Sequence, residues 1–550
     1  MSSSREQQSL DSESAVESQI TYGATKSDDE ETVLSVSPAL PPNFFWIECS
    51  LLANVFLAGF DGTVTASTYT TIGNEFKAAN TASWITSSYL ITSTAFQPLY
   101  GSFSDVLGRR VCVIGATSFF ILGCLGCGIS SNIFVLDAMR AVTGIGGGGL
   151  ITLATIVNSD LVAPEKRGSW QAFQNLLLGF GSICGASLGG VIADTLGWRW
   201  CFLAQVPVAL AGLVIGYFYI HNPKPPHVHV SVHMFDKIDI KGATALVLSL
   251  AFQMVVLSLG GNELNWSDYR LLLMLVLSIG LLFHFALIEL RTSAIPIIPP
   301  ALLHSSFSYI ILGIGVFLGI SSYAYLFVLP LLFQIVLGDT ASQAGLRLTI
   351  PALFTPVGGL IAGVLMSRKK YSLFSLVVAG CTLMLFGNFV TLFIHKGVNQ
   401  WVTGLCLIPA NVGQGLAFPT SLFSFIYNFD RDKQAIATST AYLFRSMGSV
   451  WGVTGSAAII KRVFARRCLS SLHRVPGLSE HQISTIIRTV SKDISQIQHL
   501  EPQVRSVVQG SYERAIRFAQ FLSCLCCLAC LVLAGVKKAA RIRSRSSYDE

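Results

Sequence analysis

The sequence predicts an all-α polytopic membrane protein, with two six-helix halves plus two central inserted helices and about 14 transmembrane helices in all. Three observations support this fold class. The 550 residues are 52% hydrophobic and only 12% charged, and the mean hydropathy of +0.59 is too high for a soluble protein of this length. Nearly uncharged stretches recur with the ~20 residues that a helix needs to cross ~30 Å of hydrocarbon. Basic residues gather in alternate loops.

Windows of about 19 residues define the expected spans. They fall at 44–66, 84–104, 111–130, 134–157, 170–192, 201–220, 242–260, 271–290, 307–336, 347–366, 372–394, 401–427, 434–460 and 515–536. We expect helices because a spanning helix satisfies its own backbone hydrogen bonds.

The loop charges predict that both termini are cytosolic. Loops after even-numbered spans carry basic clusters such as Arg109-Arg110 and 368–370, whereas most loops after odd-numbered spans carry single charges such as Lys77. The segment 461–514 disagrees, because it holds several arginines on the side predicted to be lumenal. It is either a lumenal amphipathic domain or a sign that the span count is wrong by one.

Composition shifts divide the chain into five expected parts. They are a disordered cytosolic tail at 1–42, an N-terminal six-helix half at 43–220, a linker with two inserted helices at 221–300, a C-terminal six-helix half at 301–536 with a long lumenal loop at 461–514, and a basic cytosolic tail at 537–550. Asn265-Trp-Ser267 is a glycosylation sequon on the predicted lumenal side.

Other function classes find little support. We expect no enzyme activity, no cofactor, no metal and no nucleic-acid partner: the cysteines lie mostly inside spans, and His227, His229 and His233 lack acidic or Cys partners. The run 144–149 lacks the Lys-Ser/Thr of a phosphate loop and indicates close helix packing. The expected partners are a small-molecule substrate, protons and the lipid bilayer. We expect the protein to be a monomer, and we expect an ion gradient to supply the energy for transport.

The sharpest motif is the stretch 101–110. It combines glycines, a carboxylate and paired cations in a short loop: Gly101, Asp105, Gly108, Arg109 and Arg110. This stretch resembles the loop 2–3 signature of the major facilitator superfamily. The resemblance implies a gating motif whose Asp forms a breakable charge latch between the two halves.

Further motifs follow in the order of that family, over residues 45–460. Arg140 to Gly146 resembles the span-four motif, and Gly181 to Gly190 resembles the span-five antiporter motif. Their glycines are expected to serve helix packing or hinges: Gly144, Gly146, Gly181, Gly185, Gly189 and Gly190. The 61–65 and 197–200 stretches resemble the fourteen-span drug:proton antiporter branch.

Two of the charges inside predicted spans, Asp61 and Arg140, are candidates for proton coupling. A charge at the centre of a span costs at least ~2.5–3.5 kcal/mol, so Arg140 needs a partner or a wet cavity. Asp61 faces the same penalty, and could take up a proton on one side and release it on the other. We expect both to couple protons to substrate, the alternatives being a snorkelling Arg140 and a structural Asp61. Candidates for lining the same cavity are the polar residues Asn54, Tyr89, Gln97 and Asn175.

Within the superfamily, the stretches 95–101, 179–181, 205–207 and 444–449 most resemble the fungal vacuolar basic amino acid transporters. This resemblance implies proton-coupled uptake of lysine, arginine or histidine across the vacuolar membrane. Two alternatives remain: a multidrug or toxin:proton exporter of the plasma membrane, and a non-transporting nutrient sensor.

Overall fold

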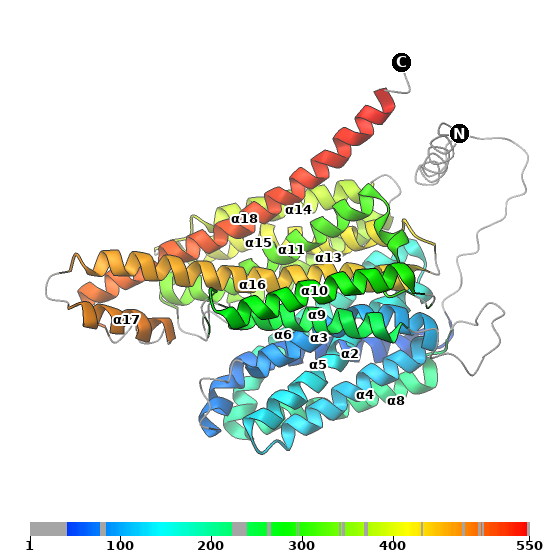
Figure 1. The fold of residues 1–550 in the computed structure, drawn as a ribbon, viewed down its shortest axis with the longest axis horizontal. Coiled ribbons are helices and arrows are strands. Elements are labelled where there is room, and N and C mark those ends of the chain that lie inside the picture. Colours follow the sequence, from blue (N-terminus) through cyan, green and yellow to red (C-terminus); the bar gives the residue numbers. More distant parts are fainter. Residues whose placement is uncertain are drawn as a thin grey trace, which may run out of the picture.

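The computed structural model is almost wholly helical in the part of the chain that it describes (Figure 1). It describes residues 41–546 except 77–83, 223–238, 261–263, 265, 293, 295, 340–342, 344–346, 368–371, 396, 431–432, 476–478, 493–496 and 498–499. Apart from helices and turns, these residues contain an isolated bridge between Gly260 and Leu264. The expected all-α class is confirmed.

The N-terminal half is a bundle of long helices. Its elements are α2 (Phe44–Glu75), α3 (Trp84–Leu107), α4 (Arg109–Gly128), α5 (Ile133–Leu161), α6 (Pro164–Thr195), the short α7 (Arg199–Leu203) and α8 (Gln205–Tyr219). Helix α2 packs against α6 and α8, whereas α5 packs against α3 and α4. Asn132 caps α5 by accepting a hydrogen bond from the backbone N–H of Val135, as an N-cap residue does.

Two further helices lie between the halves. They are α9 (Ile240–Leu259) and α10 (Tyr269–Arg291), and they pack against each other. Ser249 and Ser278 each donate a hydrogen bond to the other's backbone carbonyl, at 2.8 and 2.9 Å. Helix α9 also contacts α3 and α16, so the inserted pair bridges the two halves (Figure 1).

The C-terminal half contains the remaining helices. They are the 3-10 turn η2 (Pro300–Leu303), α11 (Ser306–Leu331) with its π-helical continuation η3 (Leu332–Leu337), α13 (Thr349–Ser367), α14 (Leu373–Thr391), α15 (Gln400–Ile426), α16 (Gln434–Leu472), α17 (Glu480–Lys492) and α18 (Pro502–Ser546). Helix α11 packs against α16 and α18, and α15 packs against α13 and α14.

Eleven helices in the described part of the chain are long and apolar enough to cross a membrane. Helices α3, α13 and α16 occupy three further predicted spans but lie outside that set. Helices α3 and α16 are rich in Ser and Thr, and α13 has a shorter apolar stretch, Leu353–Met366. The polytopic fold is therefore confirmed, while the count of fourteen spans stays a prediction.

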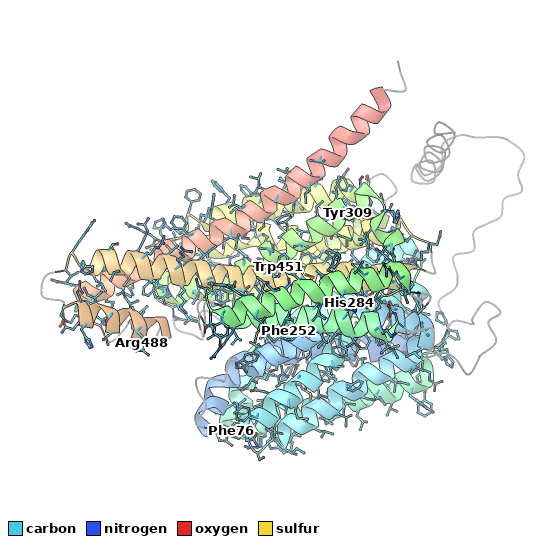
Figure 2. All side chains as sticks on the ribbon, in the orientation of Figure 1. Phe76, Phe252, His284, Tyr309, Trp451 and Arg488 are labelled. Carbon is cyan, nitrogen blue, oxygen red and sulfur yellow. The ribbon has the colours of Figure 1, made fainter. Side chains whose placement is uncertain are left out.

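Much of the segment 461–514 is helical. Helix α16 continues twelve residues past the predicted end at residue 460, and α18 begins at Pro502 instead of residue 515. The extensions pack together through Phe464 and Tyr512, whose stacked rings lie 3.9 Å apart, and α17 buries Ile483 and Val490 beside them. Figure 2 shows Arg488 of α17 well beyond Trp451, which lies near the middle of α16. These residues form a helical extension of the bundle.

Candidate functional site: a buried charge pair beside the junction of the halves

The gating motif covers the end of α3, the turn at Gly108 and the start of α4. Gly108 adopts a φ of +90°, a left-handed conformation that favours glycine. Arg109 then bonds to Asp105, and its Nε donates to Oδ2 of Asp160 at the end of α5, at 2.8 Å. The guanidinium of Arg110 lies 4.4 Å from the centre of the Tyr217 ring. These contacts tie together four helix ends of the N-terminal half, those of α3, α4, α5 and α8. The charge latch between the halves stays a prediction.

We call the side of the bundle that holds residues 101–110 the motif side. The two halves meet near it, through α3 against α16 and α6 against α13. Gly101 lies so close to α16 that a Cβ there would be 2.0 Å from Oγ of Ser439. Between α6 and α13, a Cβ on Gly363 would be 2.7 Å from the backbone N of Ser169. The halves are therefore closed against each other on the motif side.

Three hydrogen bonds between described residues join α16 to the N-terminal half at this junction. Ser446 of α16 donates to Oε1 of Gln97 at 2.6 Å, and the hydroxyls of Thr155 and Tyr442 lie 2.9 Å apart. Arg167 donates to Oε1 of Gln434 at 3.1 Å. All three partners from the C-terminal half lie in the first third of α16, which is the third nearest the motif side.

The structure pairs two of the charges that the sequence places inside spans, Asp61 and Arg140. Nη1 of Arg140 donates to both carboxylate oxygens of Asp61, each at 2.8 Å, and both side chains are fully buried. Nε of Arg140 donates to the backbone carbonyl of Ile85 at 3.1 Å. Arg140 therefore has a partner and does not snorkel to the interface. At 1.5 Å per residue, Asp61 lies about 26 Å along α2 from Phe44, towards the side opposite the motif side.

Aromatic rings and an amide enclose the pair. The guanidinium of Arg140 lies 4.6 Å from the centre of the Tyr89 ring and 5.5 Å from that of Phe202. Nε2 of Gln205 lies 3.4 Å from Oδ1 of Asp61. Such rings favour a cation, and burial makes each charge depend on the other, because removing one partner of a buried pair typically costs about 3–5 kcal/mol. Neutralisation of Asp61 would therefore leave the buried charge of Arg140 without its counter-ion.

The structure divides the four candidate cavity residues. Tyr89 lies beside the charge pair, and Gln97 bonds across the junction of the halves. Asn54 instead donates to Oγ1 of Thr117 at 3.2 Å, a bond between α2 and α4 within one half. Asn175 accepts from Gln171 of its own helix at 3.4 Å. Asn54 and Asn175 each bond within the N-terminal half, and their role in lining the cavity stays a prediction.

Most of the candidate packing glycines stand at close helix approaches. A Cβ on Gly144 would meet Oγ1 of Thr92 at 2.1 Å, and one on Gly181 would meet the backbone carbonyl of Phe56 at 2.3 Å. The same close approach recurs at Gly146 and Gly185, and the carbonyl of Gly189 accepts a hydrogen bond from the Cys201 thiol. Gly190 differs, because a Cβ there would have no neighbour within 4 Å among the described residues.

Sequence reasoning missed several residues of these contacts. Gln205 and Phe202 complete the charge cluster, and Tyr442 and Ser446 complete the junction. Gln205 is a polar residue inside the predicted apolar span 201–220, and this signal could have identified it. Asn265 and the histidines at 227, 229 and 233 lie outside the described residues.

Two helical bundles that meet on one side, with a sealed charge pair in one of them, define a polytopic membrane transport protein. The chain belongs to the Major Facilitator Superfamily, whose family model matches residues 51–453. It is therefore a transporter of small molecules and not an enzyme.

Individual relatives agree with this assignment. The chain is 50% identical to an uncharacterized transporter of Schizosaccharomyces pombe, over 92% of this chain and 89% of that protein. It is also 50% identical to the vacuolar basic amino acid transporter 2 of Saccharomyces cerevisiae, over 83% of this chain and 97% of that protein. The solved human organic anion transporter MFSD10 shares the fold, with a TM-score of 0.54 and 13% identity over 88% of this chain and 100% of that one.

Proposed function

We propose that this chain is a proton-coupled secondary transporter that moves the basic amino acids lysine, arginine and histidine across the vacuolar membrane by alternating access. The observation that carries the proposal is the 50% identity to a protein named for vacuolar basic amino acid transport. One chain contains both halves, so a monomer suffices.

Alternating access needs two states, and the junction of the halves offers one of them. The halves meet near the motif side, which the loop charges predict to be cytosolic. In this state a solute would reach the protein from the lumenal side. Separation of α3 from α16 and of α6 from α13 would open the cytosolic side.

The pair of Asp61 and Arg140 supplies a place for coupling. A proton from the acidic compartment, on reaching Asp61, would neutralise the charge that holds Arg140. Release of that proton to the other side would restore the pair. The protein would thus prefer different arrangements with and without the proton, and this difference links proton flow to substrate flow.

Uptake by isolated vacuoles tests this function. Vacuoles with the protein should accumulate radiolabelled lysine when their lumen is acidic, and vacuoles from a deletion strain should accumulate less. A collapse of the pH gradient should abolish the difference. Transport of cationic drugs with no transport of basic amino acids would favour the exporter, and signalling without any flux would favour the sensor.

A further inference from the structure

Arg445 is a second arginine in the interior of a predicted span. It is the twelfth residue of α16, about 17 Å along the helix axis from Gln434. This depth is near the middle of ~30 Å of hydrocarbon, where a cation is costly unless something compensates its charge. Neither the charge pair nor the gating motif uses this residue.

The contacts of Arg445 place its side chain beside the junction of the halves. Its guanidinium lies 4.3 Å from the centre of the Tyr442 ring and 4.8 Å from that of Phe418 in α15. Tyr442 bonds across the junction to Thr155, and Ser446, the residue after Arg445, bonds across it to Gln97. Arg445 therefore faces the neighbouring helix α15, next to two residues of α16 that bond across the junction.

Arg445 differs from Arg140 in its charge environment. Arg140 binds Asp61, whereas no carboxylate pairs with Arg445 among the residues that the structure describes. Two aromatic rings hold it instead, through attraction between the cation and their faces. This stacking occupies the face of the planar guanidinium and leaves its in-plane N–H groups available. The residue is half-buried, so these donors are not sealed.

We propose that Arg445 binds the α-carboxylate of the amino-acid substrate. A carboxylate matches the fork of N–H donors that a guanidinium presents, and it supplies the missing negative charge. The same arginine would repel a cation that has no carboxylate. Arg445 would thus select amino acids over cationic drugs and simple amines. This inference rests on the proposed function, because it assumes that the substrate is an amino acid.

The test compares lysine with cadaverine, which is lysine without its carboxylate. Binding of each compound to the purified protein is measured by calorimetry, for the wild type and for Arg445→Gln and Arg445→Lys. Loss of a hydrogen bond to a charged group typically weakens binding about ten- to hundredfold. The wild type should prefer lysine by that factor. Arg445→Gln should bind lysine that much more weakly and cadaverine no more weakly than the wild type does.

Arg445→Lys keeps the charge but loses the fork, so it should bind lysine with intermediate affinity. It also keeps the test valid if Arg445→Gln does not fold. The matched control is Arg462→Gln, an exposed arginine on the helical extension of α16, which should leave both affinities unchanged.

Equal weakening of lysine and cadaverine binding in both variants would overturn the inference, since it would indicate a purely structural role. Unchanged lysine binding would overturn it as well. In both cases wild-type lysine transport would keep the proposed function intact. A wild type that binds and transports no basic amino acid would instead refute the proposed function, and the inference with it.

Discussion

Arg140 and Asp61 lie 79 positions apart in the chain, yet one guanidinium nitrogen contacts both carboxylate oxygens at 2.8 Å. Because both side chains are fully buried, neither charge is solvated in this state. Asp61 therefore has a counter-ion within the protein, and in this state its carboxylate is not available to bind a cationic solute. Any change in the charge of Asp61 would therefore act directly on Arg140.

Asp61→Asn should abolish transport driven by a pH gradient, because the amide cannot take up and release a proton. The variant should also be less stable, by about 3–5 kcal/mol, since it leaves the buried Arg140 without its counter-ion. Lysine uptake by proteoliposomes and thermal unfolding in detergent measure the two effects. Wild-type flux in this variant would remove Asp61 from the coupling mechanism.

The double variant Asp61→Asn with Arg140→Gln separates stability from coupling. It removes both charges, so it should regain much of the lost stability, as buried pairs often do when both partners are replaced. Gradient-driven transport should remain absent. A double variant that is no more stable than Asp61→Asn would show that the two charges do not depend on each other.

Gly101→Ala should hinder closure of the motif side. Its Cβ would lie 2.0 Å from Oγ of Ser439 and 2.9 Å from the backbone carbonyl of Ala435, so α3 and α16 would have to separate. Gly115→Ala is the matched control, because a Cβ there has no neighbour within 4 Å among the described residues. Distances between spin labels on the motif side should lengthen in Gly101→Ala alone. Identical distance distributions in both variants would contradict the close contact.

Asp105→Asn should slow the exchange between open and closed states. Arg109 binds both Asp105 and Asp160, and the neutral amide would weaken the first of these contacts. Single-molecule fluorescence between the halves measures the exchange rate directly. Equal rates in the variant and the wild type would count against a gating role for Asp105.

Glu75 predicts a pH dependence of stability outside the apolar part of α2. Hydrogen bonds from Arg199, and secondarily from Trp198, lower the pKa of Glu75 from 4.5, although desolvation opposes the shift. A lowered pKa stabilises the fold above pH 4.5, and this contribution is lost as the pH falls through the lowered value. Glu75→Gln should therefore lose less stability than the wild type between neutral and acidic pH. Parallel unfolding curves would contradict this role.

The apolar windows anticipated where the long helices lie, because hydrophobicity reports burial in lipid. They missed the extension of α16 beyond residue 460. There the buried residues Ile460, Phe464, Cys468 and Leu472 recur every fourth position between basic residues, a pattern of low average hydropathy. A window average cannot detect a helix that buries only one face.

The site was only partly predictable for a related reason. A charge inside a span indicates that a partner exists, which singled out Asp61 and Arg140, but not that each is the other's partner. Polarity alone also does not show which way a side chain points: Tyr89 faces the charge pair, whereas Asn54 of α2 bonds to Thr117 of α4. Arg445 lies inside the predicted span 434–460, so the sequence also shows it to be a charge inside a span, as it does for Arg140.

The most direct test of proton-coupled transport of basic amino acids is simultaneous measurement of lysine and proton flux in proteoliposomes that contain only this protein. With an acidic interior, external lysine should accumulate against its gradient while protons leave, and the same vesicles without a pH gradient should only equilibrate. Lysine accumulation that is identical with and without the gradient, or proton movement that lysine does not change, would contradict the account.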